Sequence, residues 1–547
     1  MISTGLVQLA SDASNNIREL NSGAASQFLL TGSLAEAHIN VAATIILAVC
    51  TALVLFMVPG LAFFYGGLVR RKNVATIMAQ CFISMAIVTA IWIFGGFGLA
   101  FGSDTHGGFI GNIANYVFFK NILFTDGWRH LGLVVNATLA DGVPFILFFL
   151  FQLAFAIITP ALVVGAFADR LSWRGYIIFN VLFTIFVYIP VCHWIWGGGF
   201  LAQAGVLDWA GGIVIHATCG LAAIASVVVL GRRAVMKKET TAPSSLALVS
   251  VGAGILYFGW FGFNVGGSVY MPEVWANMAQ ATQGAANAAA FHTSMENALN
   301  IGVAAFVNSF LGMIAAMLMW MSLDFIVNKG KTSLASILTA GVAGLATITP
   351  AAGYVPMWAG LVFGLVGGLI TYGMCKVNHH THFDDALEVW PVHGIGGIVG
   401  ALLLGAFATT LVNPNVLGAT QHIGQSLGSG YLFGMEVGAV ALVCAWTFVF
   451  SLAIFAITLL TKDKMTTEQQ IEGLDKVLFN EVAYAPEISI DVVMHGDGEE
   501  LTSHRHASKL SSKKSFKKIN NSYDSQLAAN KSGDTLASKI DNARHQE

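Results

Sequence analysis

The sequence predicts an all-α membrane protein with eleven transmembrane helices, a five-plus-five inverted repeat and a C-terminal cytoplasmic tail. The first observation behind this fold class is composition. Of the 547 residues, 55% are hydrophobic and 10% are charged, against about 45–50% and about 25% in soluble proteins. The second is a series of long apolar runs, and the third is a pattern that two of these runs share. The composition excludes a soluble enzyme.

The apolar runs supply the predicted membrane spans. A bilayer core about 30 Å thick requires about 20 largely apolar residues in a spanning helix. The run at 334–350 is the shortest and is rich in glycine. All six cysteines lie inside such runs, where we expect small buried side chains rather than disulfides. The eleven runs are 39–68, 73–101, 142–168, 175–196, 211–231, 246–266, 298–323, 334–350, 355–376, 392–411 and 431–461.

Charged residues divide the chain into a membrane body and polar ends. Residues 38–461 contain 27 charged side chains, and the much shorter segment 462–547 contains 26. From Ser503 to Ser522 there are six Lys or Arg and no acid, which indicates either a disordered tail or attraction to an anionic inner leaflet. The predicted domains are an extracellular or periplasmic extension (1–38), an eleven-span domain (39–461), a cytoplasmic regulatory region (462–487) and a disordered tail (488–547).

Basic residues predict the orientation, because cytoplasmic loops are enriched in Lys and Arg. The loops after odd-numbered spans contain 14 such residues. The N-terminal segment and the loops after even-numbered spans contain 3. We therefore expect a multi-pass protein of the cell membrane, with the N-terminus outside and the C-terminus in the cytoplasm. The regular alternation also supports the count of eleven spans.

Two segments, in the fifth and tenth spans, share a pattern of polar residues. A separation of five spans would invert the second copy in the membrane, as in transporters whose site lies between inverted halves. Each segment has an aspartate eight residues before a histidine and a glycine four residues after it: Asp208, His216 and Gly220, then Asp385, His393 and Gly397.

His216 and His393 are the strongest candidates for function. Ionisable groups at membrane depth are costly and usually face a cavity or a partner. A histidine pair near the pseudo-twofold axis can pass a proton or bind a small polar solute through a hydrogen bond. Two alternatives stay open: each histidine packs against a backbone carbonyl, or the pair binds a metal. The metal is disfavoured because no further ligand stands at suitable spacing.

The loop before the fifth span carries the next candidates. Trp196 precedes three glycines, which would leave its ring bare and able to attract a cation to its π face. Trp194 and Trp209 fit the aromatic belt at a membrane interface. Asp208 either coordinates a cation directly or caps the helix that follows, and its sequence context favours the cap.

A histidine cluster, His379-His380-Thr-His382, follows the ninth span beside Asp384. Its composition is similar to a metal-binding tract. We expect a solvated inner loop instead, with no metal and no cofactor.

The motifs together resemble the ammonium transporter family, the Amt, Mep and Rh superfamily, over residues 39 to about 485. The ordered set is specific because it recurs along the whole membrane body. It comprises Pro59-Gly-Leu-Ala-Phe-Phe-Tyr-Gly-Gly-Leu-Val-Arg-Arg-Lys-Asn73, Phe151-Gln-Leu-Ala-Phe155, Gly165-Ala-Phe-Ala-Asp169-Arg170, Trp196-Gly-Gly-Gly, Asp208-x-Ala-Gly-Gly-x-Val-x-His216, Trp260-Phe-Gly-Phe263-Asn264, Asp384-Asp-Ala-Leu-Glu388-x-x-x-x-His393-Gly, and Glu472-Gly-Leu-Asp475 with Ala483-Tyr484.

The resemblance implies an outer site that recruits ammonium at Trp196 and Phe155. A serine of the family donates a hydroxyl to this site. Here Gly267 stands at that place and Ser268 follows, so either the loop shifts by one residue and Ser268 serves, or the site relies on aromatic rings. Asp208 would shape the site without touching the ion.

Below the recruitment site, the resemblance implies a gate of two stacked rings, Phe155 and Phe263. His216 and His393 would line an apolar pore. Ammonium would lose its proton at the vestibule, ammonia would pass along the histidines, and the proton would take a linked route through them. The implied partners are ammonium or ammonia, the lipid bilayer and two further copies in a homotrimer. No nucleic acid is expected.

Two further departures from the family pattern concern the inner side. Glu388 and Trp390 replace the usual Asp and Phe before His393. In the C-terminal motif, Phe479-Asn480 stands where the family has His-Gly. That segment is the place where the resemblance implies a PII-type regulator.

Competing functions come from two other classes. An Rh-like channel for a neutral gas is disfavoured by Trp196, because a neutral solute gains little from a cation site. An ammonium sensor signalling through a bound partner is the second alternative, and no output-domain motif follows residue 485. An enzyme is not expected, because no nucleophile or cofactor motif is present.

Overall fold

The computed structural model describes the membrane body and leaves aside the two ends of the chain. The predicted extension at 1–38 and the predicted tail at 488–547 lie outside the described residues. The chain divides into two compact units, Met1–Ala485 and Pro486–Glu547. The described residues are 39–125, 130–131, 134–136, 139–140, 142–234, 242–269, 285–381, 383–413 and 427–484.

The first unit is built from helices, which confirms the all-α prediction. Within the described ranges, ten helices are long and apolar enough to cross a membrane. An eleventh apolar helix, α14 (Leu334–Ile348), is shorter. The ten candidate spans are Val41–Leu68, Arg71–Phe101, Phe145–Val163, Trp173–Gln203, Gly212–Leu230, Leu246–Val269, Leu299–Val327, Ala359–His380, Trp390–Phe407 and Gly430–Leu460.

Several spans consist of more than one helical segment. The second span, expected as one run, bends through a π-helical turn at Gly95, whose φ of 139° is open to glycine. The longer helices are α3 (Val41–Leu68), α4 (Val74–Ile91), α6 (Phe145–Val163), α7 (Trp173–Phe183), α10 (Thr218–Leu230), α11 (Leu246–Val265), α13 (Ala285–Val327), α15 (Ala359–His380), α16 (Gly396–Phe407) and α18 (Gly430–Leu460). The shorter helices are α5 (Phe97–Phe101), α8 (Ile189–Ile195), α9 (Phe200–Gln203) and α19 (Thr467–Glu472).

Short elements connect or interrupt these helices. Two residues in each of β1 (Phe124–Thr125) and β2 (His130–Leu131) pair antiparallel. The 3₁₀ turns are η1 (Arg71–Asn73), η3 (Ile113–Asn115), η4 (Val117–Phe119) and η8 (Gly266–Val269). The π-helical turns are η2 (Trp92–Gly96), η5 (Thr184–Tyr188), η6 (Gly212–Ala217), η9 (Trp390–Ile395) and η10 (Asp475–Phe479).

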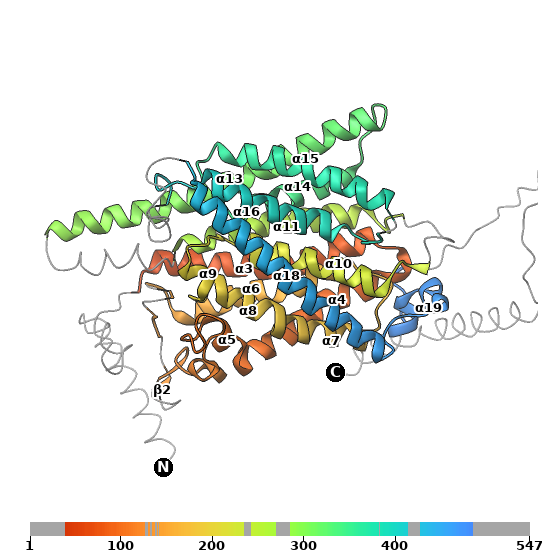
Figure 1. Cartoon of the computed structure of the whole chain (residues 1–547), viewed down its shortest axis with the longest axis horizontal. Helices are drawn as coiled ribbons and strands as arrows, with labels where there is room; N and C mark the ends of the chain where they lie inside the picture. The colour runs from red at the N-terminus through yellow and green to blue at the C-terminus, as the bar shows by residue number, and fades with distance from the viewer. Residues whose placement is uncertain are drawn as a thin grey trace, which may run out of the picture. The chain divides into compact units, whose positions relative to one another are not determined.

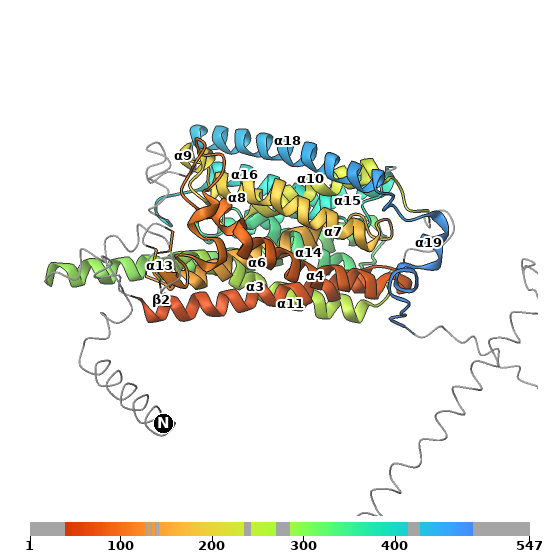
Figure 2. The same ribbon diagram turned by 90° about the horizontal axis from the view of Figure 1, so that it is seen from below.

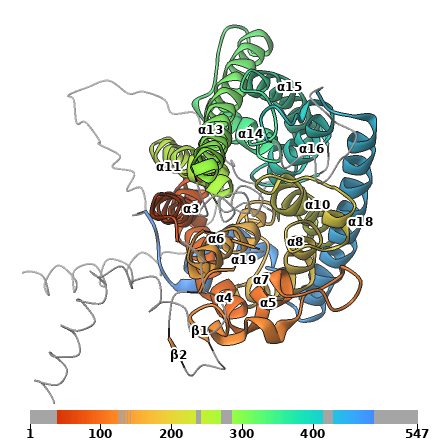
Figure 3. The same ribbon diagram turned by 90° about the vertical axis from the view of Figure 1, so that its left-hand side faces the viewer.

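The helices of this unit lie side by side along one direction (Figure 1). α3 packs along α11, and η6 with α10 packs against η9 and α16. α18 crosses the side of the bundle opposite α3 and α11 (Figure 2), where it contacts α10 and α16. The view along the helices places α14 on the inner side of α13 and α15 (Figure 3).

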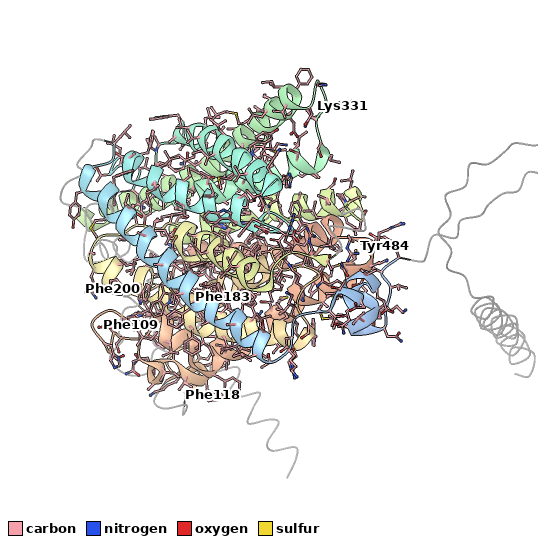
Figure 4. The ribbon with its side chains drawn as sticks, turned by 45° about the vertical axis from the view of Figure 1, so that its right-hand side comes forward. Phe109, Phe118, Phe183, Phe200, Lys331 and Tyr484 are labelled. Carbon is pink, nitrogen blue, oxygen red and sulfur yellow. The ribbon has the colours of Figure 1, made fainter. Side chains whose placement is uncertain are left out.

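The two ends of the bundle differ. Phe109, Phe118 and Phe200 lie at one end, which we call the α9 end, and Lys331 and Tyr484 lie at the other, the α19 end (Figure 4). Loops at the α9 end carry the β1–β2 pair. Most of the described basic residues stand in the loops after odd-numbered spans, one of which carries Lys331 at the α19 end, whereas Lys120 stands in the loop of Phe118 (Figure 4).

The C-terminal segment of the unit is fixed to the α19 end by hydrogen bonds. The carboxylate of Asp475 accepts from the backbone N–H groups of Ala75 (3.0 Å) and Thr76 (2.7 Å) at the start of α4. The N–H of Leu474 donates to Asn73 Oδ1 (2.7 Å). A carboxylate at a helix N-terminus satisfies amide groups that lack partners within the helix. The segment is therefore an integrated part of this surface.

Candidate functional site

Asp208 positions the first histidine by capping η6. Its Oδ1 accepts from Gly211 and Gly212 N–H (2.9 and 2.7 Å), and its Oδ2 accepts from Ile213 and Val214 N–H (2.8 and 2.9 Å). Gly211 has φ 106°, a left-handed conformation that costs an L-residue about 1 kcal/mol or more. The predicted cap is confirmed, and all four bonds go to backbone groups, so the carboxylate is occupied by the helix.

A related arrangement at η9 positions the second histidine, His393. Asp385 Oδ2 accepts from the N–H of Trp390 (2.6 Å), the first residue of that turn. A Cβ added to Gly220 would overlap the backbone of Gly394. A Cβ added to Gly397 would overlap the backbone of η6. Glycine at these points lets the two helices cross in close contact beside the histidines.

His216 and His393 meet in the interior. Their Nδ1 atoms are 3.2 Å apart, and their rings are nearly parallel, at 15° with centroids 5.2 Å apart. Both side chains are buried. Because an Nδ1–Nδ1 hydrogen bond needs one donor and one acceptor, the neutral pair must hold different tautomers. His216 Nε2 is buried without a hydrogen-bond partner among the described residues.

A row of aromatic rings leads from the α9 end to the histidines. Trp196 lies 5.8 Å from Phe155 between ring centroids, and Phe155 meets Phe263 edge to face at 4.5 Å and 86°. Phe263 then lies 6.2 Å from His216. The half-exposed Trp196 is oriented by its indole N–H, which donates to the Asp208 carbonyl oxygen (2.7 Å).

Two cavities lie along this row. The one at the α9 end, the mouth cavity, has a volume of about 250 Å³ and is lined by Trp196, Phe155, Phe263 and Asp208 among others. The second, the histidine cavity, has about 20 Å³ and is lined by both histidines, Tyr65 and mostly apolar side chains. A volume of about 10–15 Å³ holds one water-sized molecule. Phe263 lines both cavities, so it stands between them.

Ser268 is not brought to this row. Its hydroxyl is buried and donates to the Val265 carbonyl oxygen (2.8 Å). Gly267 lines the mouth cavity instead, close to the Trp209 ring. The loop therefore does not shift by one residue, because η8 points the Ser268 side chain toward α13 near Gly302.

The belt interpretation of two tryptophans is wrong. Trp194 and Trp209 are 1% and 7% exposed. Their indole N–H groups donate to the carbonyl oxygens of Phe109 (2.9 Å) and Asn264 (2.6 Å). The interfacial belt requires a ring at the lipid headgroups, whereas these rings tie loops to helices inside the protein.

Two aromatic residues of the site received no role in the sequence analysis, although Trp260 stands in one of its motifs. Trp260 stacks on His216 (5.4 Å, 19°) and bonds Thr349 Oγ1 (2.8 Å). Its position three residues before Phe263 places both on one helix face, which was the available signal. Tyr354 lines the mouth cavity and comes from a loop with no motif of its own.

The inner histidine cluster is a helix end, not a loop. His379 and His380 are the last residues of α15, and His382 lies outside the described residues. His379 Nε2 is 2.6 Å from Glu388 Oε1. No group of three or more metal-ligating side chains occurs in the part of the chain that the structure describes.

The gate rings, expected to be stacked, instead meet edge to face. A bundle of apolar helices, with a mouth cavity leading through these rings to a buried histidine pair, defines a multi-pass membrane protein of the transporter class. The chain belongs to the ammonium transporter family, since the sequence model of the Ammonium Transporter Family matches residues 45–484. This is a family of transporters and not of enzymes.

Individual relatives agree with this assignment. An "Ammonium transporter" of Aquifex aeolicus is 37% identical over 451 residues, which cover 82% of this chain and 95% of that protein. "Ammonium transporter Amt1" of Archaeoglobus fulgidus is 35% identical and covers 79% and 97%. The crystal structure of Candida albicans Mep2 superposes with a TM-score of 0.63 at 28% identity, covering 76% of this chain and 84% of that one.

Proposed function

We propose that this protein transports ammonium across the cell membrane. The observation that carries the proposal is the unbroken row Trp196, Phe155, Phe263, His216 and His393 between the mouth cavity and the interior. The names of its relatives support the substrate. An aromatic mouth followed by a narrow apolar cavity is the combination expected for a cation that loses a proton before it crosses the membrane.

Recruitment takes place on the face of Trp196. Its edge is held by the Asp208 carbonyl, so the ring face stays toward the mouth cavity. The Asp208 carboxylate is committed to four backbone N–H groups and shapes the site without binding the ion. A cation near the ring gains about 0.5–2 kcal/mol.

The edge-to-face pair of Phe155 and Phe263 acts as the gate, because it separates the two cavities. An ammonium ion would lose its hydration in the histidine cavity at high cost. It therefore gives its proton to water at the mouth, where an N–H bond breaks and an O–H bond of hydronium forms, and it passes as ammonia. The proton follows through His216 and His393, whose Nδ1 atoms are within hydrogen-bonding distance.

We infer the family architecture for the rest of the molecule. The short helix α14 serves as the eighth of eleven spans, and the close contact of η6 and α10 with η9 and α16 supports a five-plus-five inverted repeat. The positive residues in the loops at the α19 end support a cytoplasmic position for that end and an outer position for the N-terminus. The proposed domains are 1–38, 39–461, 462–487 and 488–547. The assembly is a homotrimer, and a PII-type regulator acts at the segment held by Asp475.

The test removes the histidine relay. His216→Leu, His393→Leu and the double variant are purified, reconstituted and compared with the wild type for ammonium-evoked and potassium-evoked currents on a supported membrane. We expect each single variant to lose the ammonium-selective current. The double variant should be no worse than the worse single one, because two like charges at this distance exclude each other and the pair works as one unit.

Wild-type-like, ammonium-selective current in either single variant would show that the proton does not pass through the two histidines. His380→Gln is the control, since this exposed histidine lies outside both cavities of the row.

A further inference from the structure

A third cavity lies at the α19 end and takes no part in the function proposed above. Its volume is about 600 Å³. The ends of α13 and α15 and the loop before η9 form much of its wall. Charged and polar side chains on that wall include Asp324, Tyr372, His379, Asp384, Asp385 and Glu388. In the proposed function, the solute and the proton leave the protein at this end, and this cavity lies there.

His379 and Glu388 meet on the wall of this cavity. His379 Nε2 and Glu388 Oε1 are 2.6 Å apart, and the two side chains are 59% and 19% exposed. They come from different elements, the last turn of α15 and the loop that leads into η9. The imidazole thus faces water while the carboxylate lies deeper. A pair with a solvent-exposed imidazole and a largely buried carboxylate can exchange a proton between the cavity and bulk water.

The backbone at Glu388 is strained and tied to the pore helix. Glu388 has φ 61°, which is uncommon for a residue that is not glycine. Its carbonyl oxygen accepts from the N–H of Val392 (3.0 Å), the residue before His393. Strain of this kind persists where the surroundings require one side-chain direction, and it clusters at functional sites. Here the backbone conformation of Glu388, five residues before His393, directs its carboxylate to the cavity.

Two buried oxygens next to the pair have no partner among the described residues. They are Asn378 Oδ1 and Asp385 Oδ1, and the Asn378 amide donates to the Asp385 carbonyl (3.2 Å). The two aspartates of the repeat therefore differ, because Asp208 uses both oxygens for its cap. Burial raises the pKa of Asp385 to about 6, against its backbone hydrogen bonds. Unpaired buried acceptors favour a proton or a hydrogen-bond donor beside them.

The other charges around the pair are already engaged. Asp384 binds the Arg233 guanidinium (2.7 Å), which outweighs burial and holds the pKa of Asp384 below its ordinary value. Lys376 lies 3.9 Å from Asp324, whose Oδ1 also accepts from the Tyr372 hydroxyl (3.0 Å). The titratable and charged groups that interact with His379 or Glu388 are Lys376, Asp385 and Cys375, and Cys375 also hydrogen-bonds Glu388.

We propose that Glu388 and His379 form a proton-exchange pair at the α19-end mouth, which takes up the proton arriving with the transported ammonia and releases it to water. This rests on the proposed function and extends its proton route. A hydronium ion that carries the proton from the histidines gives it to the Glu388 carboxylate, so an O–H bond of hydronium breaks and a carboxyl O–H bond forms. The pair then releases one proton from the exposed imidazole to water, and its charge returns to the starting value.

The test controls the pH on the inner side alone. Cells expressing the full chain are recorded in whole-cell mode with pipette solutions of about pH 5.5 to 8.5, a range that brackets the ordinary histidine pKa of about 6.5. Ammonium is the substrate, and outer pH is varied separately. The variants are Glu388→Gln, His379→Gln and Glu388→Asp, with membrane abundance measured for each.

We expect Glu388→Gln and His379→Gln to reduce the ammonium current severalfold and to shift its dependence on inner pH, with the dependence on outer pH retained. Glu388→Asp should restore part of the current because it keeps an acid at the cavity wall. His380→Gln is the matched control, since this neighbouring ring is exposed and bonds the Lys376 carbonyl (2.6 Å).

Unchanged inner-pH profiles in both glutamine variants would overturn the pair, as would the same shift in His380→Gln. Loss of surface protein in one glutamine variant moves the decision to the other, for which an inner-pH profile identical to wild type overturns the proposal. Absence of ammonium current in the wild type would instead refute the proposed transport.

Discussion

At the scale of single residues, Trp196 illustrates how one side chain acquires a role from its neighbours. Its indole edge is held by the Asp208 carbonyl, and the glycines that follow leave the ring half-exposed. Trp194, two residues earlier, is buried and bonds Phe109. The same residue type thus belongs to the proposed recruitment site in one case and forms a buried hydrogen bond to a loop in the other.

The first prediction concerns this ring. Trp196→Leu should raise the ammonium concentration for half-maximal current, because leucine offers no π face. The loss of about 0.5–2 kcal/mol corresponds to roughly twofold to thirtyfold. Concentration-dependent currents of the reconstituted variant provide the measurement.

Trp358→Leu is the control for this change, because Trp358 is 51% exposed and lies outside the mouth cavity. An unchanged half-saturation in Trp196→Leu would reduce Trp196 to a packing residue.

At the scale of elements, two π-helical turns bring the histidines together. An aspartate precedes each turn and accepts backbone N–H groups at its start, Asp208 before η6 and Asp385 before η9. π turns are rare and often occur at functional sites. The glycines at the crossing allow the two helices to approach until the imidazoles are in contact.

The second prediction tests this crossing. Gly220→Ala should destabilise the protein by about 1–3 kcal/mol, because the added methyl group meets the backbone of Gly394 and cannot be relieved by a rotamer change. It should also reduce ammonium current by separating the histidines. Thermal unfolding of the purified variant and its current provide the measurements.

Gly254→Ala is the matched control, since a Cβ at this α11 position meets no atom within 4 Å. This substitution should be neutral or stabilise the helix by up to about 1 kcal/mol. Equal behaviour of the two alanine variants would mean that the crossing tolerates side chains.

At the scale of the whole molecule, the basic residues are concentrated in the loops that follow odd-numbered spans. Lys331 and the docked C-terminal segment share the α19 end, and the loop that contains Phe109 and Phe118 lies at the opposite end (Figure 4). Basic loops stay on the cytoplasmic side during insertion. We therefore expect the protein to lie in the membrane with its α19 end on the cytoplasmic side.

The third prediction is a topology test. Cysteine at position 105, by Thr105→Cys, should react with an impermeant thiol reagent added to intact cells, and Lys331→Cys should react only after permeabilisation. Both positions are exposed. The native cysteines are buried except for the half-buried Cys444, so Cys444→Ser gives a quiet background. Labelling of position 331 from outside would reverse the proposed orientation.

The sequence by itself determined the helical membrane class, the approximate bounds of the spans and the Asp208 cap. These depend on local features: run length against bilayer thickness, and a carboxylate directly before a helix start. The shared spacing around His216 and His393 also predicted that the two residues would meet, because equivalent positions of an inverted repeat come together near its axis.

Only the tertiary structure decided which side chains face the mouth. Gly267 lines it and Ser268 does not, since successive side chains of a 3₁₀ turn such as η8 point about 120° apart. Trp194 and Trp209 are buried because loops from distant parts of the chain cover them. The contact between His379 and Glu388 likewise joins a helix end to a strained loop. Such contacts depend on packing between segments, and no local pattern in the sequence encodes them.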